Sequence, residues 1–218
     1  MDITQKLIAC AAAMTMLIGT ASCAKEEGEH DHDHNIVGDD IAADANVSAD
    51  NMPFGANEVI MSSDDSGNVP ITICYDDRYI TDTEASMISK YFSSLNNNDV
   101  TMFSSVIYAP YLSAIMASTD KFNTTEDYLT AQNQSLTNML GDGFRFDYIY
   151  FKDGLFSGDY DFTDYDAVVF ANEPSAQITD RKLLTAEIEY TNSLGNGSYV
   201  TDINVCLYTI DGVPYILR

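Results

Sequence analysis

The spacing of apolar residues changes near residue 143, and this change constrains the fold more than any other feature of the chain. Before it, apolar residues recur at helical spacing after capping residues such as Thr81, Asp99 and Thr124. After it, apolar and polar residues alternate, beginning at Phe144. We therefore expect an α+β fold, in which N-terminal helices cover the apolar face of a largely antiparallel sheet.

The expected elements follow from these signals and from the turn residues between them. Pro110 breaks or restarts the second helical piece, and Gly141 is a suitable stop for the third helix. Gly-Asn-Gly at 195–197 and Asp-Gly at 211–212 predict hairpins. We expect strands at 69–75, 144–151, 183–191, 199–210 and 213–217, and helices starting near 82, 100 and 125, with a shorter helix at 164–172.

Residues 1–22 have the composition of an exported leader. A basic residue, Lys6, precedes an apolar stretch that is shorter than the roughly 20 residues of a membrane-spanning helix. Ala21, Ser22 and Cys23 follow it, and this ending resembles the lipobox of bacterial lipoproteins. A second match ending at Cys10 leaves too little apolar length before the cut.

The lipobox resemblance implies that Cys23 becomes the mature N-terminus and carries a diacylglyceryl group. Two acyl chains anchor a protein stably, whereas one binds a membrane reversibly. The expected location is therefore the cell membrane, with the protein facing outside the cytoplasm. The alternative is an ordinary secreted protein in which Cys23 is an incidental thiol.

Composition divides the mature chain into a tether and one domain. Residues 23–57 are rich in Asp, Glu, Gly, Ala and Asn and lack a sustained apolar period, so we expect a disordered linker. Residues 58–218 are expected to form the folded domain. A formal net charge of -24 and an isoelectric point near 4.1 argue against nucleic acid and anionic lipid headgroups as partners.

Two cysteines, Cys74 and Cys206, lie in expected strands of the domain, each on the face opposite its apolar neighbours. A disulfide between them would close a loop of more than a hundred residues, worth on the order of 4 kcal/mol if unstrained. Spacing alone does not establish pairing, so two separate thiols remain the alternative.

The order of elements, together with residues 86–92 and 211–217, resembles the NTF2-like superfamily over residues 82–218. The resemblance implies helices packed on a curved sheet to form a cone with an apolar interior. Its members include isomerases, dehydratases and noncatalytic extracellular domains, so the fold alone does not assign a function. The isomerases use a carboxylate facing tyrosine or acidic donors, residue types found here in Asp147, Tyr148 and Tyr150.

Two acidic or histidine-rich segments are candidate metal sites. His30, His32 and His34 include every histidine of the chain, and alternate residues of an extended segment can direct three imidazoles to Zn²⁺ or a similar ion. The alternative is a polar, soluble tether. The segment 158–166 contains four aspartates, but it lacks EF-hand spacing and more often such residues form turns and helix caps.

The sequence favours a lipid-anchored, noncatalytic module that binds a small apolar ligand or another envelope protein. The alternatives are a metal-capturing lipoprotein that uses the histidine tract, and an NTF2-like isomerase or dehydratase. The domain contains no histidine, phosphate loop or dinucleotide fingerprint. We therefore expect no cofactor and assign no catalytic residue.

Overall fold

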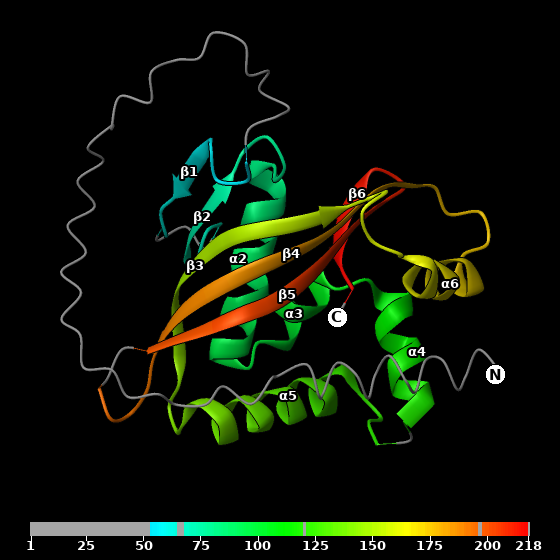
Figure 1. The fold of residues 1–218 in the computed structure, drawn as a ribbon. Coiled ribbons are helices and arrows are strands. Elements are labelled where there is room, and N and C mark those ends of the chain that lie inside the picture. Colours follow the sequence, from blue (N-terminus) through cyan, green and yellow to red (C-terminus); the bar gives the residue numbers. More distant parts are fainter. Residues whose placement is uncertain (1–52, 65–67, 120, 196–197, 218) are drawn as a thin grey trace, which may run out of the picture.

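A computed structural model describes residues 53–64, 68–119, 121–195 and 198–217, which form a six-stranded sheet and five helices (Figure 1). The strands follow the order β1-β2-β3-β4-β5-β6 across the sheet. Their bounds are β1 Glu58–Met61, β2 Thr72–Asp76, β3 Arg145–Phe156, β4 Ile178–Thr191, β5 Ser198–Ile210 and β6 Val213–Ile216.

The helices begin where capping side chains satisfy their first amide groups. Thr81 and Glu84 form the expected capping box of α2, and Asp99 accepts a hydrogen bond from the Met102 amide at 2.9 Å at the start of α3. Thr124 caps α5 in the same way as Thr81 caps α2. The helix bounds are α2 Asp82–Asn97, α3 Val100–Val106, α4 Ala109–Thr119, α5 Thr125–Leu140 and α6 Thr163–Asn172.

The sheet is largely antiparallel, as expected, with one parallel pair. Strands β2 and β3 run parallel, and the helices α2 to α5 form the long connection that such a pair needs. All other neighbouring strands pair in the antiparallel direction. The turn before β6 has positive φ at both Asp211 and Gly212, which suits the predicted two-residue hairpin. The chain is therefore a mixed α+β fold with a mostly antiparallel sheet.

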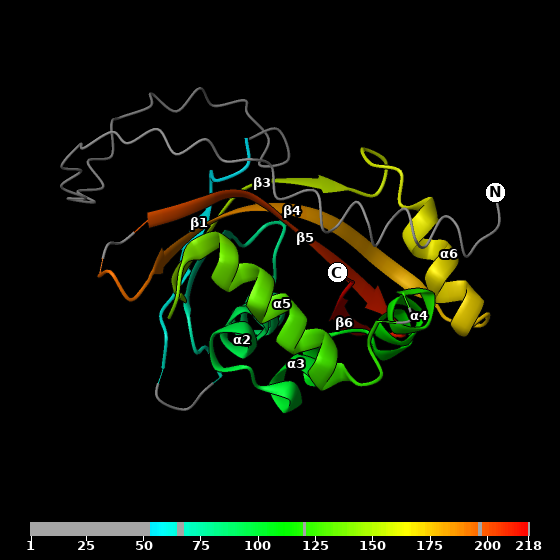
Figure 2. The ribbon, with the colours of Figure 1, turned by 90° about the horizontal axis from the view of Figure 1, so that it is seen from below.

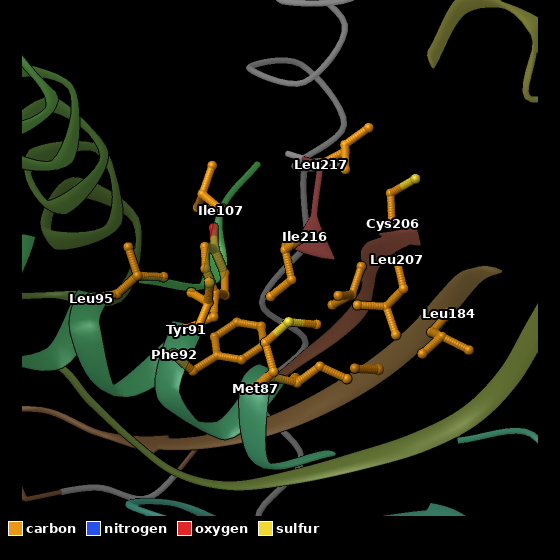
Figure 3. Close-up of a cluster of buried hydrophobic side chains, with 14 of the residues drawn as sticks. Met87, Tyr91, Phe92, Leu95, Ile107, Leu184, Cys206, Leu207, Ile216 and Leu217 are labelled. Atoms are coloured by element: carbon orange, nitrogen blue, oxygen red, sulfur yellow. The ribbon is translucent and has the colours of Figure 1, made fainter. Parts of the chain in front are cut away.

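Helices α2, α3 and α5 lie together on one side of the sheet (Figure 2). Met87 and Phe92 of α2 point toward Leu184 and Leu207 of the sheet in Figure 3. Leu184 has no exposed surface and Leu207 only 1%. Burying a side chain of this kind contributes roughly 1.5–3 kcal/mol, so this layer holds the main core.

A second, smaller layer covers one end of the opposite face. Tyr208 follows Leu207 on β5, so its side chain points away from the main core. It is nevertheless 1% exposed, because Phe162 and Tyr165 from the α6 region pack against its ring. Helices α4 and α6 lie together at this end of the molecule (Figures 1 and 2). At this end of β5, the sheet is thus covered on both faces.

The last residues of the expected linker lie within the part of the chain that the structure describes. Residues 53–57, which we assigned to the linker, make specific contacts with the domain. The Phe54 ring stacks on Tyr79 at 5.4 Å, and the Gly55 amide donates to Asp76 at 2.9 Å. The short strand β1 that follows was also missed. Among the described residues, no helix has both the length and the apolar content needed to span a bilayer.

Candidate functional site

The part of the sheet that faces away from α2, and that α4 and α6 leave uncovered, carries tyrosine and glutamate side chains in register. On β3, Tyr148 and Tyr150 point away from the buried residues Ile149 and Phe151. Tyr148 lies opposite Glu189 of β4, which in turn lies opposite Tyr199 of β5, and Tyr150 lies opposite Glu187. We call Tyr148, Tyr150, Glu187, Glu189 and Tyr199 the tyrosine–glutamate face.

Local hydrogen bonds hold two of the tyrosines in place. The Tyr150 hydroxyl donates to Glu58 at 2.8 Å, and this bond, with burial and the carboxylate charge, raises the pKa of Tyr150 to about 12. Burial is the main reason that the pKa of Tyr148 is raised, and its hydroxyl interacts with the Cys74 thiol. Both phenols therefore stay protonated at physiological pH and remain hydrogen-bond donors.

The third tyrosine is more open to solvent, and the two glutamates are half-buried. Tyr199 is 47% exposed. Burial, followed by the charge of Glu189 and a hydrogen bond to it, raises the pKa of Tyr199. Lys152 approaches Glu187 at 3.4 Å, with about a third of each side chain exposed. An exposed ion pair of this kind is worth at most about 1 kcal/mol, so Glu187 can exchange Lys152 for another cation at little cost.

Exposed apolar side chains border the tyrosine–glutamate face. Ile60 of β1 is 62% exposed and lies opposite Cys74, beyond which comes Tyr150. Leu155 of β3 is 40% exposed and lies opposite Leu183. Exposed tyrosine beside aliphatic residues is common at protein interfaces, whereas a solvated surface needs neither.

A hydrogen-bonded cluster fixes α6 to the sheet next to this face. Arg181 of β4 binds both carboxylate oxygens of Asp166, at 2.8 and 3.0 Å. The Tyr208 hydroxyl also donates to Asp166 at 2.9 Å. The carboxylate thus receives three bonds from two strands, and the Arg181 guanidinium lies over the Tyr208 ring. These partners satisfy one another, so we interpret the cluster as structural.

A second buried charge cluster lies in the main core. The Lys182 ammonium donates to both oxygens of Glu84, at 2.7 and 2.8 Å, and lies 3.0 Å from Asp180. Glu84 also receives the Thr81 amide in the α2 capping box. Lys182 and Glu84 are 8% and 5% exposed. Because solvent hardly reaches this pair, it ties α2 to β4 and does not face a ligand.

The metal-site expectations divide between two parts of the chain. His30, His32 and His34 lie outside the described residues, so zinc binding by this tract stays a prediction. In the acidic segment, Asp161 accepts the Thr163 amide at 3.0 Å at the start of α6, and Asp166 pairs with Arg181. Within the described ranges, no group of three or more His, Cys, Asp or Glu side chains is arranged to hold a metal ion.

Cys74 and Cys206 are free thiols in the structure, so the bridge considered above is not formed. They lie on β2 and β5, and β3 and β4 separate these strands. Neighbouring strands are about 4.8 Å apart, which places the two cysteines well beyond the roughly 7 Å limit between the Cα atoms of a disulfide. Both point away from the main core, as expected, yet both are buried. Cys23 lies outside the described residues.

The isomerase-like combination is not assembled inside the fold. Asp147 accepts the Thr191 hydroxyl at 2.8 Å and lies near Arg145 at the exposed end of β3. Tyr148 and Tyr150 project from the face opposite α2, α3 and α5, not into the main core. The three residues therefore do not place a carboxylate and phenols around an enclosed substrate.

Sequence reasoning singled out Tyr148 and Tyr150 but missed the residues beside them. Glu187, Glu189 and Tyr199 were part of expected strands, and their alternation with buried residues was visible. The missing information was which β3 residues they would lie against. That register comes from strand pairing across the sheet, which a single sequence does not specify.

Comparison of the chain with protein-family models, with curated proteins and with solved structures finds no match.

Proposed function

We propose that this protein is a lipid-anchored, noncatalytic module that binds another envelope protein through its tyrosine–glutamate face. The observation that carries the proposal is the exposure of Tyr199, Ile60 and Leu155 on a sheet face that the main helix layer leaves open. Tyrosines offer large, rigid contact area together with a polar tip, and they are enriched at binding interfaces.

The packed interior supports binding at the surface over binding of a small apolar ligand inside a cone. Ile88 of α2 and Ile149, Leu184 and Ala186 of the sheet each have no accessible surface. A void wide enough for water leaves accessible surface on the atoms around it, so side chains fill the space next to these residues. A ligand there would have to displace close-packed core groups, which costs stability.

The proposed anchor places this face outside the cytoplasm. Lipid on Cys23 would hold the protein at the membrane, and the acidic segment that follows would be repelled by anionic headgroups. Metabolic labelling with palmitate tests the anchor in the native host. We expect label in the wild-type protein and none in Cys23→Ala, which should also leave the membrane fraction. An unlabelled wild-type protein would contradict the anchor.

We also propose that this mixed α+β domain has the specific fold of the NTF2-like superfamily. The long helix α2 packs on one face of a mostly antiparallel sheet, and the strands β3 to β6 pair in sequence order. This arrangement supports the proposal but leaves its function open, since the fold hosts catalytic and noncatalytic proteins. An experimental structure with a different strand order would overturn it.

Site-directed photocrosslinking tests the proposed interface in the intact membrane. A photoreactive phenylalanine analogue replaces Tyr199 in one variant and the exposed Gln134 of α5, on the helical side, in the control. We expect a discrete crosslinked adduct with another envelope protein from position 199 and none from position 134. No adduct from either position, or equal adducts from both, would contradict the proposed function.

A further inference from the structure

We infer that the tyrosine–glutamate face receives an extended, cationic segment of its partner, with lysine or arginine at alternate positions. This inference rests on the proposed function and specifies the chemistry of the partner. Three features carry it: the spacing of the glutamates, the tyrosines on either side of them, and the charge of the competing occupants.

The two glutamates repeat at the period of an extended chain. Glu187 and Glu189 are two residues apart on β4 and point to the same side, so their attachment points are roughly 7 Å apart. An extended peptide lying along β4 presents its own alternate side chains at the same repeat. Each second residue of such a segment therefore meets a carboxylate.

The tyrosines flank the two glutamates and form the sides of the proposed binding site for the cationic segment. Tyr148 and Tyr150 of β3 lie on one side of the glutamates, and Tyr199 of β5 lies on the other. An ammonium or guanidinium group is attracted to the face of a tyrosine ring within about 6 Å, and this attraction adds to its pairing with a carboxylate. Glu187 already pairs with one cation, Lys152, at 3.4 Å. The face thus contains an example of the carboxylate–ammonium pairing that we infer for the partner.

Charge disfavours the other occupants of this surface. A second copy of the domain that docked through the same face would bring the same two glutamates against the first pair. The protein's own segment 24–52 contains Lys25 as its only lysine or arginine beside nine acidic residues. Nucleic acid and anionic lipid would be repelled by both the face and the net charge of -24. A basic protein segment is the occupant that complements this face.

Two peptides of identical composition test the inference with the mature protein. In the first, lysine and threonine alternate; in the second, the lysines are grouped at one end. Titration calorimetry at about 0.15 M salt limits attraction at long range, because the Debye length is then about 8 Å. We expect the alternating peptide to bind more tightly than the grouped one. Equal affinity for the two peptides, or no binding of the alternating one, would overturn the inference.

Charge-matched variants separate the face from the overall charge of the protein. Glu187→Gln with Glu189→Gln removes two charges from the face, and Asp142→Asn with Asp159→Asn removes two exposed charges elsewhere. The loss of two partly exposed ion pairs should weaken binding of the alternating peptide about tenfold. The control pair should change the affinity less than about twofold, since it leaves the face intact. Equal weakening by both double variants would refute specific recognition of the peptide by the tyrosine–glutamate face.

The photocrosslink from position 199 distinguishes failure of this inference from failure of the proposed function. If Glu187→Gln with Glu189→Gln leaves the adduct unchanged, the partner binds the face without a cationic segment. The inference then fails while the proposed function stands. If the crosslinker at position 199 gives no adduct while Glu187 and Glu189 are intact, the proposed interface itself is wrong. Circular dichroism of the glutamine variant should match that of the wild type, because glutamine preserves the size and hydrogen-bonding capacity of these half-exposed side chains.

Discussion

Replacing Lys182 by methionine tests the electrostatics of the main core. The ammonium group of Lys182 donates to both oxygens of Glu84, at 2.7 and 2.8 Å, and only 9% of the lysine side chain is exposed. Methionine has a similar length and fills much of the same volume, so the change removes a charge without opening a large cavity. Glu84 then stays buried without its counterion.

The expected loss of stability follows from that uncompensated charge. Removing one partner of a buried ion pair costs about 3–5 kcal/mol. The Thr81 amide and hydroxyl still donate to Glu84 at 2.9 Å, so we expect the lower end of that range, about 3 kcal/mol. For a domain of this size, each kcal/mol lowers the melting temperature by roughly 2–4 °C. Lys182→Met should therefore melt about 6–12 °C below the wild type.

A double variant isolates the charge from the packing. Glu84→Gln keeps an oxygen that accepts the Thr81 amide, so the capping box survives while the buried charge disappears. We expect Glu84→Gln with Lys182→Met to regain most of the stability that Lys182→Met loses. Urea unfolding of the mature chain, followed by circular dichroism, measures both. A single variant within about 1 kcal/mol of wild type, or a double variant as unstable as the single one, would refute the reasoning.

Three further predictions concern the tether junction, the thiols and the histidine tract. Burial alone would raise the pKa of Asp76, but hydrogen bonds from Arg78 and Gly55 outweigh it and lower that pKa. The ionised carboxylate thus adds stability at neutral pH that is lost as the pH falls below about 4, so the deficit of Asp76→Asn in urea unfolding should shrink there. Cys74 and Cys206 should react with a thiol reagent only after unfolding, since burial raises the pKa of both, and prompt labelling would contradict their burial. Calorimetry should detect zinc binding to the mature protein that disappears when His30, His32 and His34 are replaced by Ala; affinity that survives the replacement would exclude the tract.

The elements that could be predicted from the sequence are those with local causes. The capping box at Thr81 and Glu84 satisfies amides within a single turn, so four adjacent residues were enough to place the start of α2. Asp211 and Gly212 both take positive φ, a need that their residue types already indicate. Such features depend on residues that are adjacent in the chain, so they can be predicted without a structure.

The elements that were missed depend on contacts between distant residues. Strand β1 has only four residues, and its pairing with β2 is stabilised from outside the strand. Phe54 stacks on Tyr79, and Tyr79 stacks on Phe156 at 4.9 Å, about a hundred positions further along the chain than Phe54. The spacing of apolar residues along the sequence does not predict such a contact. The parallel pairing of β2 with β3 was missed for the same reason.

The candidate face shows where alternation stops being informative. A strand pattern separates two faces, but it does not say whether a second layer covers the outer one. On β5, the outward positions change from Asn204 to Cys206 and Tyr208, which are buried under the α6 side. On β4, the partner of Asn204 is Thr185, and the two side chains are 3.2 Å apart. Along β5, the outer face therefore changes from the exposed, polar Asn204 to the buried Cys206 and Tyr208.

The change in outward residues along β4 and β5 explains why the tyrosine–glutamate face is exposed. Where the α6 region covers the sheet, the outward residues of β5 are the buried Cys206 and Tyr208; where it does not, the outward residues of β4 are Glu187 and Glu189. Burying Glu187 and Glu189 under a helix would cost several kcal/mol each unless each gained a partner that satisfied it in the buried state. A second layer over the glutamates is therefore disfavoured, and the tyrosines in register with them are left available to a partner.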